Sequence, residues 1–279
     1  MRVRKAFALY LAAVGITSAV SFAISSEPLV YTLGAATLLG LALTNFVTAK
    51  KLTALEGRLA TQFESMLPQI QSMVEITSLL HLRTPLPPLG GWAISHDFAG
   101  AQVSILLERK PALVIELGSG ASTVLSAYCL EKNADGGRVI AFDHEAKYAG
   151  ITSALLLRHG LAGIATVIHA PLTECEVGGR KQRWYDAAAL ASIRQPIDIL
   201  IIDGPPQSTQ KDARYPALPL LRDLLAPDAI VLLDDADRLD ERKLVSDWLA
   251  ECPGFELERL PHLKGTAILR RSAAERMMV

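Results

Sequence analysis

The stretch that decides the fold is Ala112–Leu117, ALVIEL, which leads through the turn Gly118-Ser119-Gly120 into a helical pattern at 122–131. An apolar run, a glycine turn and a helix form the first half of a β-α-β unit. Further short apolar runs are RVIAFD at 138–143, ATVIH at 165–169, IDILIID at 197–203 and AIVLLD at 229–234. Strands that are apolar almost throughout are typical of a parallel sheet covered by helices on both faces. This region is therefore predicted to be an α/β domain with a doubly wound sheet.

The composition excludes several classes of protein. The chain has 279 residues, a formal net charge of −1 and 50% hydrophobic residues, so a disordered chain and a basic nucleic-acid-binding protein are both disfavoured. Cys129, Cys175 and Cys252 lie far apart, which predicts neither a disulfide framework nor a zinc site and suits a reducing compartment. The mean hydropathy of +0.27 is high for a soluble protein and points to a membrane-associated part.

That part is predicted at residues 1–49. Between Ala6 and Ala49 the only charged residue is Glu27, which separates two uncharged stretches, Ala6–Ile24 and Leu29–Ala49. Because about 20 apolar residues span a bilayer, each stretch is long enough to be a transmembrane helix. The basic residues that flank the pair are Arg2, Arg4, Lys5, Lys50 and Lys51. They place both ends of a two-span hairpin on the cytoplasmic side of the inner membrane. A cleaved signal peptide and a buried soluble hairpin are the alternatives.

Residues 50–84 are predicted to form an amphipathic helical stalk. Apolar residues recur there every seven positions, at Leu52, Leu59, Met66, Met73 and Leu80. Pro68 is expected to kink or divide the helix. The stalk has three possible partners: a second copy in a homo-oligomer, its own globular domain, or the membrane surface. The proline-rich stretch 84–91 then marks the start of a domain at 85–279.

Polar residues gather where the predicted strands end, namely at Glu116, Gly118, Asp143, His169, Asp203, Asp234 and Asp235. Ligands of open α/β sheets bind beyond the carboxyl ends of the strands, so these positions predict a single site. The glycine turn lets the backbone approach a ligand closely, and Asp143 stands where a carboxylate accepts hydrogen bonds from ribose hydroxyls. A dinucleotide fingerprint would have glycine at position 123, where this chain has Thr123. An NAD-linked oxidoreductase is therefore the weaker alternative, and the charge of Glu116 favours a cationic or zwitterionic ligand.

These motifs resemble those of class I S-adenosylmethionine-dependent methyltransferases. The resemblance rests on ELGSG at 116–120, FDH at 142–144 and DGPP at 203–206. Residues 90–271 are similar along their whole length to a bacterial methyltransferase group of unassigned substrate. The other matching elements are GWAIS at 91–95, HAPL at 169–172, RYPA at 214–217 and LLDD at 232–235.

The resemblance implies a Rossmann-like sheet of seven strands whose last strand is antiparallel, which fits the two C-terminal runs Phe255–Arg259 and Thr266–Arg270. It also implies S-adenosylmethionine as cofactor. The cofactor-binding residues that it implies are Glu116, Gly118, Ser119, Gly120, Asp143, Ala170 and Asp203. Among them, Gly118 and Gly120 would lie under the methionine part, Asp143 on the ribose and Ala170 near the adenine.

Methyl transfer to a hydroxyl requires that its proton be taken up by a base or that a metal lower its pKa. The candidate bases are Asp203 and His169, with His96 as a further histidine. Asp203, Asp234 and Asp235 together form a candidate Mg²⁺ site of oxygen ligands, similar to the acids of catechol O-methyltransferase, although Asp235 replaces an amide. Alternatively, one of Asp234 and Asp235 caps the next helix and the other faces solvent, and the histidines are structural.

Two further expectations concern the acceptor. Trp92 is expected either in a lid over the pocket or in packing between stalk and domain. Arg214 and Tyr215 are candidates for recognising an anionic or sugar group. The sequence thus predicts a membrane-anchored methyltransferase that acts on oxygen in a glycan, a lipid-linked molecule or another small hydroxyl acceptor, with membrane lipid as a partner. The alternative from another class is a non-catalytic nucleotide-binding or scaffold module at the membrane.

Overall fold

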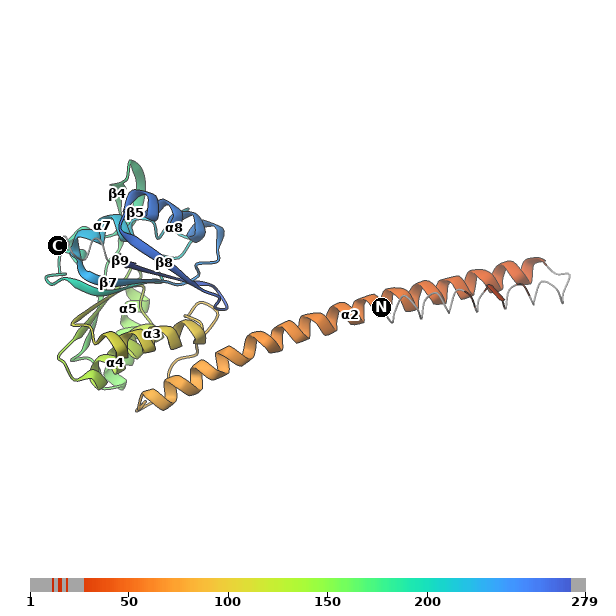
Figure 1. Ribbon diagram of the computed structural model, residues 1–279, viewed down its shortest axis with the longest axis horizontal. Helices are drawn as coiled ribbons and strands as arrows, with labels where there is room; N and C mark the ends of the chain where they lie inside the picture. The colour runs from red at the N-terminus through yellow and green to blue at the C-terminus, as the bar shows by residue number, and fades with distance from the viewer. Residues whose placement is uncertain (1–11, 13–14, 17–18, 20–27, 272–279) are drawn as a thin grey trace. The chain divides into compact units, whose positions relative to one another are not determined.

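The structure is a computed structural model that describes residues 12, 15–16, 19 and 28–271. The chain divides into two compact units, one up to Leu67 and one from Pro68 onward. The sheet and the helices that cover it all belong to the second unit (Figure 1). The division between the two units falls at Pro68, within the segment 50–84 predicted as a stalk.

A single helix, α2 (Pro28–Leu79), replaces the predicted succession of span and stalk. It continues through Pro68 without the predicted division. Within the described part of the chain, no helix is both apolar and long enough to cross a membrane. The predicted span Leu29–Ala49 is therefore not supported, since it is part of a helix that continues into the charged residues after Ala49. The other predicted span, Ala6–Ile24, lies almost entirely outside the described residues.

The sheet confirms the predicted α/β class. Its strands are β1 (Leu113–Leu117), β2 (Arg138–Asp143), β3 (Ala165–His169), β6 (Ile197–Ile202), β7 (Leu225–Leu233), β8 (Phe255–Leu260) and β9 (Thr266–Arg271). They lie in the order β3-β2-β1-β6-β7-β9-β8. The strands from β3 to β7 pair in parallel, and β9 is antiparallel to both of its neighbours. The last strand of the chain is thus antiparallel, as the resemblance implied.

Helices cover both faces of this sheet. They are α3 (His96–Arg109), α4 (Ala121–Asn133), α5 (Ala146–Arg158), α6 (Ala187–Leu190), α7 (Ala217–Leu221) and α8 (Leu239–Glu251). Figure 1 shows α3 and α4 on one side of the sheet and α7 and α8 on the other. The predicted helix at 215–225 is shorter than expected, because a 3₁₀ turn at Arg222–Leu224 leads directly into β7.

Alternation along β1 divides the interior into two cores. Leu113, Ile115 and Leu117 pack into the core that contains α7 and α8. Val114 packs into the other core, with side chains of α3 and α4. Because successive side chains of a strand point to opposite faces, Glu116 is directed toward α4. This orientation decides its role below.

One element, a β-hairpin, is not predicted from the sequence. β4 (Leu172–Val177) pairs with β5 (Arg180–Tyr185) in antiparallel fashion, and Gly178 and Gly179 at the turn have φ values of +56° and +70°. β4 (LTECEV) mixes polar and apolar residues, and β5 (RKQRWY) begins with four polar ones. Neither strand therefore contains the continuous apolar run on which the strand predictions rest. Tyr185, at the end of β5, is 2% exposed and reaches the site described below.

The last part of α2 packs on the globular unit. Ile76 and Leu80 are buried in the same core as α3 and α4. The Gln69 side chain accepts hydrogen bonds from the backbone N–H groups of His96 (2.9 Å) and Asp97 (3.3 Å), so it caps the N-terminus of α3. Of the three alternatives for the stalk, packing on its own domain is therefore confirmed for this segment.

This packing predicts different costs for two isoleucines of α2. Ile76 is fully buried, whereas Ile70 is 54% exposed. Ile76→Ala should lower the free energy of unfolding by about 2–5 kcal/mol, because it leaves a cavity in the core. Ile70→Ala is the matched control and should change little. Urea denaturation of both full-length variants measures the difference, and equal effects would contradict this packing.

Candidate active site

A cavity of about 840 Å³ lies at the carboxyl ends of the parallel strands. Its wall includes Gly118, Ser119, Gly120, Asp143, Asp203 and Asp235, which follow or end β1, β2, β6 and β7. Of the positions predicted to converge, Gly118, Asp143, Asp203 and Asp235 line this cavity, whereas Glu116, His169 and Asp234 do not. The volume is within the range of small-molecule sites.

Two glycines allow the turns after β1 and β6 to pack backbone against backbone. Gly118 has a φ of +102°, and a Cβ on it would lie 3.3 Å from the backbone nitrogen of Gly204. A Cβ on Gly204 would lie 2.6 Å from the Tyr185 hydroxyl oxygen. A side chain at either position would therefore crowd the floor of the cavity. The glycine turn is needed for this close approach.

Asp143 is held rigidly in the cavity wall. Its Oδ2 accepts a hydrogen bond of 2.6 Å from the Ser119 hydroxyl, and its Oδ1 accepts one of 3.0 Å from the backbone N–H of Glu145. Both contacts come from residues that also line the cavity. The carboxylate is thus fixed at a position where a ligand hydroxyl can reach it.

Glu116 does not line the cavity. It is 1% exposed and accepts hydrogen bonds from the hydroxyls of Ser122 (3.0 Å), Thr123 (2.8 Å) and Ser126 (2.6 Å), all on α4. Burial raises the pKa of its carboxyl, and the three hydroxyls offset part of this effect. Its direct contact with a cofactor, implied by the resemblance, is not supported, because alternation along β1 turns the side chain toward α4. Glu116 instead ties the helix after the glycine turn to the sheet.

The expected histidine base is not placed at the cavity either. His169 is exposed and does not line the cavity. It ends β3, the edge strand, which is separated from β1 by β2. Ala170, expected near an adenine, is fully buried and donates its backbone N–H to the carbonyl oxygen of Asp143 (2.8 Å). It therefore stabilises the backbone of Asp143. His96 lines a different hollow, next to residues 82–89.

The three aspartates meet as predicted. One carboxylate oxygen from each of Asp203, Asp234 and Asp235 lies within 4.8 Å of the others. Arg214, only 3% exposed, donates to Asp203 Oδ1 (3.1 Å) and Asp235 Oδ2 (2.9 Å). It therefore binds the acids of the domain itself and is not free to recognise an acceptor. Tyr215 is fully buried and donates its hydroxyl to Glu251, so it does not recognise one either.

Two more cations reach the same acids. Arg238 lies 2.9 Å from Asp235 Oδ1, and the Lys264 ammonium lies 3.9 Å from both Asp234 Oδ2 and Asp235 Oδ1. The oxygens of Asp235 are thus both paired with arginines. Neither side-chain oxygen of Asp234 has a hydrogen-bond partner among the described residues. A Mg²⁺ ion, which needs about six oxygen ligands, does not fit a cluster whose oxygens already face three cations.

Burial shifts the pKa values of the Asp203 and Asp234 carboxyls. It raises the pKa of both carboxyls well above the ordinary value, while Arg214 lowers the pKa of Asp203 in part and the Asp235 charge raises that of Asp234 further. The Asp203 side chain remains 24% exposed and lines the cavity. A carboxylate with a raised pKa that faces a cavity is suited to accept a proton.

The cavity also contains residues that the sequence did not single out. Tyr148, Tyr185 and Arg238 line it, and the buried hydroxyl of Tyr185 has no hydrogen-bond partner among the described residues. Trp92 lines the opening and is 87% exposed, which favours the lid interpretation over packing between stalk and domain. No local pattern marks Tyr148, Tyr185 and Arg238 in the sequence, because they come from elements far apart in the chain.

Comparison with known proteins identifies the domain. Residues 115–236 match a family described as a methyltransferase domain, and this range runs from β1 to just beyond Asp235. It contains the glycine turn and all three aspartates of the cluster. The domain is accordingly a methyltransferase. No curated protein matches the sequence.

Solved structures of methyltransferases are among those that match this chain. An SAH-bound methyltransferase from Podospora anserina is 16% identical, with 65% of this chain and 80% of that chain covered and a TM-score of 0.49. The O-methyltransferase TomG from Streptomyces achromogenes, in complex with SAM, is 17% identical, with 66% and 84% covered and a TM-score of 0.49. An O-methyltransferase from Bacillus cereus, in complex with SAH, is 17% identical, with 74% and 90% covered and a TM-score of 0.48.

The buried carboxyl of Glu116 predicts a pH-dependent stability. Because its pKa is raised on folding, the stabilisation that it contributes is present at low pH and is lost as the pH rises through the folded-state pKa. Glu116→Gln cannot titrate. The free energy of unfolding of the unaltered protein, relative to this variant, should therefore fall between about pH 5 and about pH 8.

Urea denaturation at both pH values measures this difference. Glu108→Gln is the control, because Glu108 is an exposed glutamate of α3. A difference for Glu116→Gln that stays constant or rises with pH would contradict the buried, proton-binding carboxyl.

Proposed function

We propose that this methyltransferase uses S-adenosylmethionine as methyl donor and transfers the methyl group to a hydroxyl oxygen of a small acceptor. The observation that carries the proposal is the single cavity in which the glycine turn, Asp143 and Asp203 meet. This combination offers a backbone cradle, a hydroxyl-binding carboxylate and a proton acceptor within one wall. The methyltransferase-domain match covers all three features.

The cavity residues fit this donor. A Cβ on Gly118 or Gly204 would crowd the cradle, so the two glycines leave room for the methionine part. The two oxygens of Asp143 are available to the ribose hydroxyls, which would replace the Ser119 contact. Tyr148 lines the same cavity as Asp143, and its ring offers a surface on which adenine can stack. The unpartnered hydroxyl of Tyr185 is a further hydrogen-bonding group for the ligand.

Asp203 is the proposed proton acceptor. The donor, when bound, supplies a methyl carbon on a positively charged sulfur, which the acceptor oxygen displaces in line. The protein holds the acceptor in that line, excludes water and accepts the hydroxyl proton as the new O–C bond forms and the C–S bond breaks. Arg214 contacts Oδ1 of Asp203, which leaves Oδ2 to take the proton.

We also propose that the N-terminal residues attach the protein to the cytoplasmic face of the inner membrane, where a glycan or lipid-linked hydroxyl would be the acceptor. In support, residues 6–24 contain no charged residue and follow three basic ones. In addition, Leu39, Leu41, Leu43 and Val47 of α2 are exposed. The acceptor class follows from this location alone.

Variants of the two acids separate binding from chemistry. Asp143→Ala should weaken S-adenosylmethionine binding by about tenfold or more, because hydrogen bonds to a charged group are lost. Asp203→Asn should retain binding but reduce turnover by about a hundredfold or more, because the base is removed. Calorimetry on the full chain measures binding. Release of S-adenosylhomocysteine, with an extract of the source cells as acceptor, measures turnover.

The control is Asp135→Ala, since Asp135 is exposed and does not line the cavity. A change of less than about threefold for Asp143→Ala would refute the ribose assignment. If the unaltered protein does not bind S-adenosylmethionine, the non-catalytic scaffold is the better interpretation.

Membrane attachment predicts that the full chain stays in the membrane pellet after alkaline carbonate washing. Ile16→Lys combined with Val20→Lys should release it, because each buried lysine opposes insertion by about 3 kcal/mol. Leu157→Lys, at an exposed position of α5, is the control and should not release it. An unaltered chain found in the wash would exclude the attachment.

A further inference from the structure

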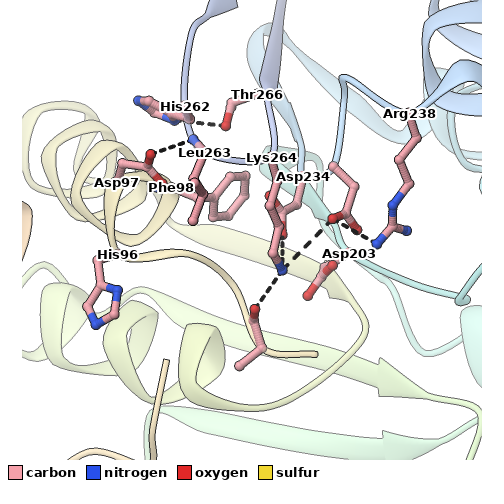
Figure 2. A network of polar contacts seen from close by, with 12 residues as sticks. His96, Asp97, Phe98, Asp203, Asp234, Arg238, His262, Leu263, Lys264 and Thr266 are labelled. Carbon is pink, nitrogen blue, oxygen red and sulfur yellow. Dashed lines mark hydrogen bonds and ion pairs between the residues drawn. The ribbon is translucent and has the colours of Figure 1, made fainter. Parts of the chain in front are cut away.

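The cation nearest to the orphaned carboxylate of Asp234 comes from the hairpin at the C-terminal edge of the sheet. Lys264 lies in the loop between β8 and β9, and its ammonium is 3.9 Å from Asp234 Oδ2. Asp234 is 0% exposed. A buried carboxylate without a hydrogen bond is costly unless a charge lies close to it. Figure 2 shows the Lys264 side chain reaching in beside Asp234, with Asp203 and Arg238 next to it.

The backbone holds this loop firmly in place. The N–H groups of Ala236 and Asp237 donate to the carbonyl oxygens of Gly265 (3.0 Å) and Lys264 (3.1 Å). From the other side, Asp97 Oδ2 accepts a hydrogen bond from the backbone N–H of Leu263 (2.7 Å), as Figure 2 shows. The position of the ammonium is therefore built into the fold and does not depend on a freely moving surface side chain.

Lys264 also contacts the opening of the cavity. Its ammonium donates a hydrogen bond of 2.8 Å to the carbonyl oxygen of Ala93, the residue after Trp92. The Lys264 ammonium thus faces Asp234, Asp235 and the Ala93 carbonyl at the cavity opening at the same time. A cation that entered the cluster would meet this ammonium at a few ångströms and would have to displace it from all three partners.

We propose that Lys264 is the resident cation of the aspartate cluster and, with Arg214, takes the place of a divalent metal, so that this methyltransferase site works without one. The consequence for catalysis rests on the proposed function. The occupation of the cluster by Lys264 is independent of the proposed function, because it follows from the contacts around Asp234 and Asp235. Lys264 is a positioning residue, since it acts through these acids and the Ala93 carbonyl.

Binding of Mn²⁺, followed by its electron paramagnetic resonance signal, tests the proposal without donor or acceptor. The unaltered full chain should bind Mn²⁺ at least about tenfold more weakly than Lys264→Met, which keeps the length of the side chain and removes its charge. Adding Asp234→Asn to Lys264→Met should abolish the new binding. Lys243→Met is the matched control, because Lys243 is an exposed lysine of α8 and should leave Mn²⁺ binding unchanged.

Each result is decisive. Tight Mn²⁺ binding by the unaltered chain would overturn the proposal, even if Lys264→Met failed to fold. A folded Lys264→Met variant that binds no more Mn²⁺ than the unaltered chain would also overturn it. In addition, S-adenosylmethionine binding and turnover by the unaltered chain should persist after dialysis against EDTA. Loss of turnover that Mg²⁺ restores would again overturn the proposal, whereas failure to bind the donor would count only against the proposed function.

Discussion

The close approach of the turns after β1 and β6 is the constraint on which the site depends. Gly118 and Gly204 meet backbone to backbone, and a side chain on either one would push these turns apart or collide with Tyr185. Their contact fixes the distance between the cradle and Asp203. The three hydroxyls that hold Glu116 fix the helix that follows the first turn. The cavity is thus a consequence of main-chain packing, which side chains from more distant elements then complete.

Charge is the second constraint, because three carboxylates meet and two of them, Asp234 and Asp235, are almost fully buried. Burial of that kind is tolerated only with nearby cations. Arg214 supplies one cation from the loop after β6, and Arg238 supplies another from the loop after β7. Lys264 comes from the far hairpin. Antiparallel insertion of β9 beside β7 is what brings this lysine to the end of β7, so the unusual strand direction serves the site as well as the sheet.

The parts of the structure that could be predicted from the sequence are those encoded locally. Continuous apolar runs located the strands of the sheet, and the acids at their ends predicted the convergence at Asp203 and Asp235. The distance of His169 from the cavity could not be predicted, because it depends on the order of the strands in the sheet, and the hydrophobic periodicity of a sequence does not determine that order. The hairpin β4–β5 lacked an apolar run. The sequence does contain a signal for the role of Glu116. Ser122, Thr123 and Ser126 place three hydroxyls on α4, and they face an acid that is flanked by core residues.

Lys264 shows why a set of acids is a weak basis for predicting a metal. Carboxylates gather at strand ends for reasons of topology, and the sequence around them does not reveal which cation balances them. Here the balancing ammonium belongs to a residue 29 positions after Asp235, within the turn 262–265, and no local feature links it to the cluster. Its bond to the Ala93 carbonyl further couples the electrostatics of the acids to the position of the segment that carries Trp92. The Lys264 side chain therefore both neutralises the cluster and shapes the cavity opening. A change in the charge of the cluster should consequently alter the position of the segment at the opening.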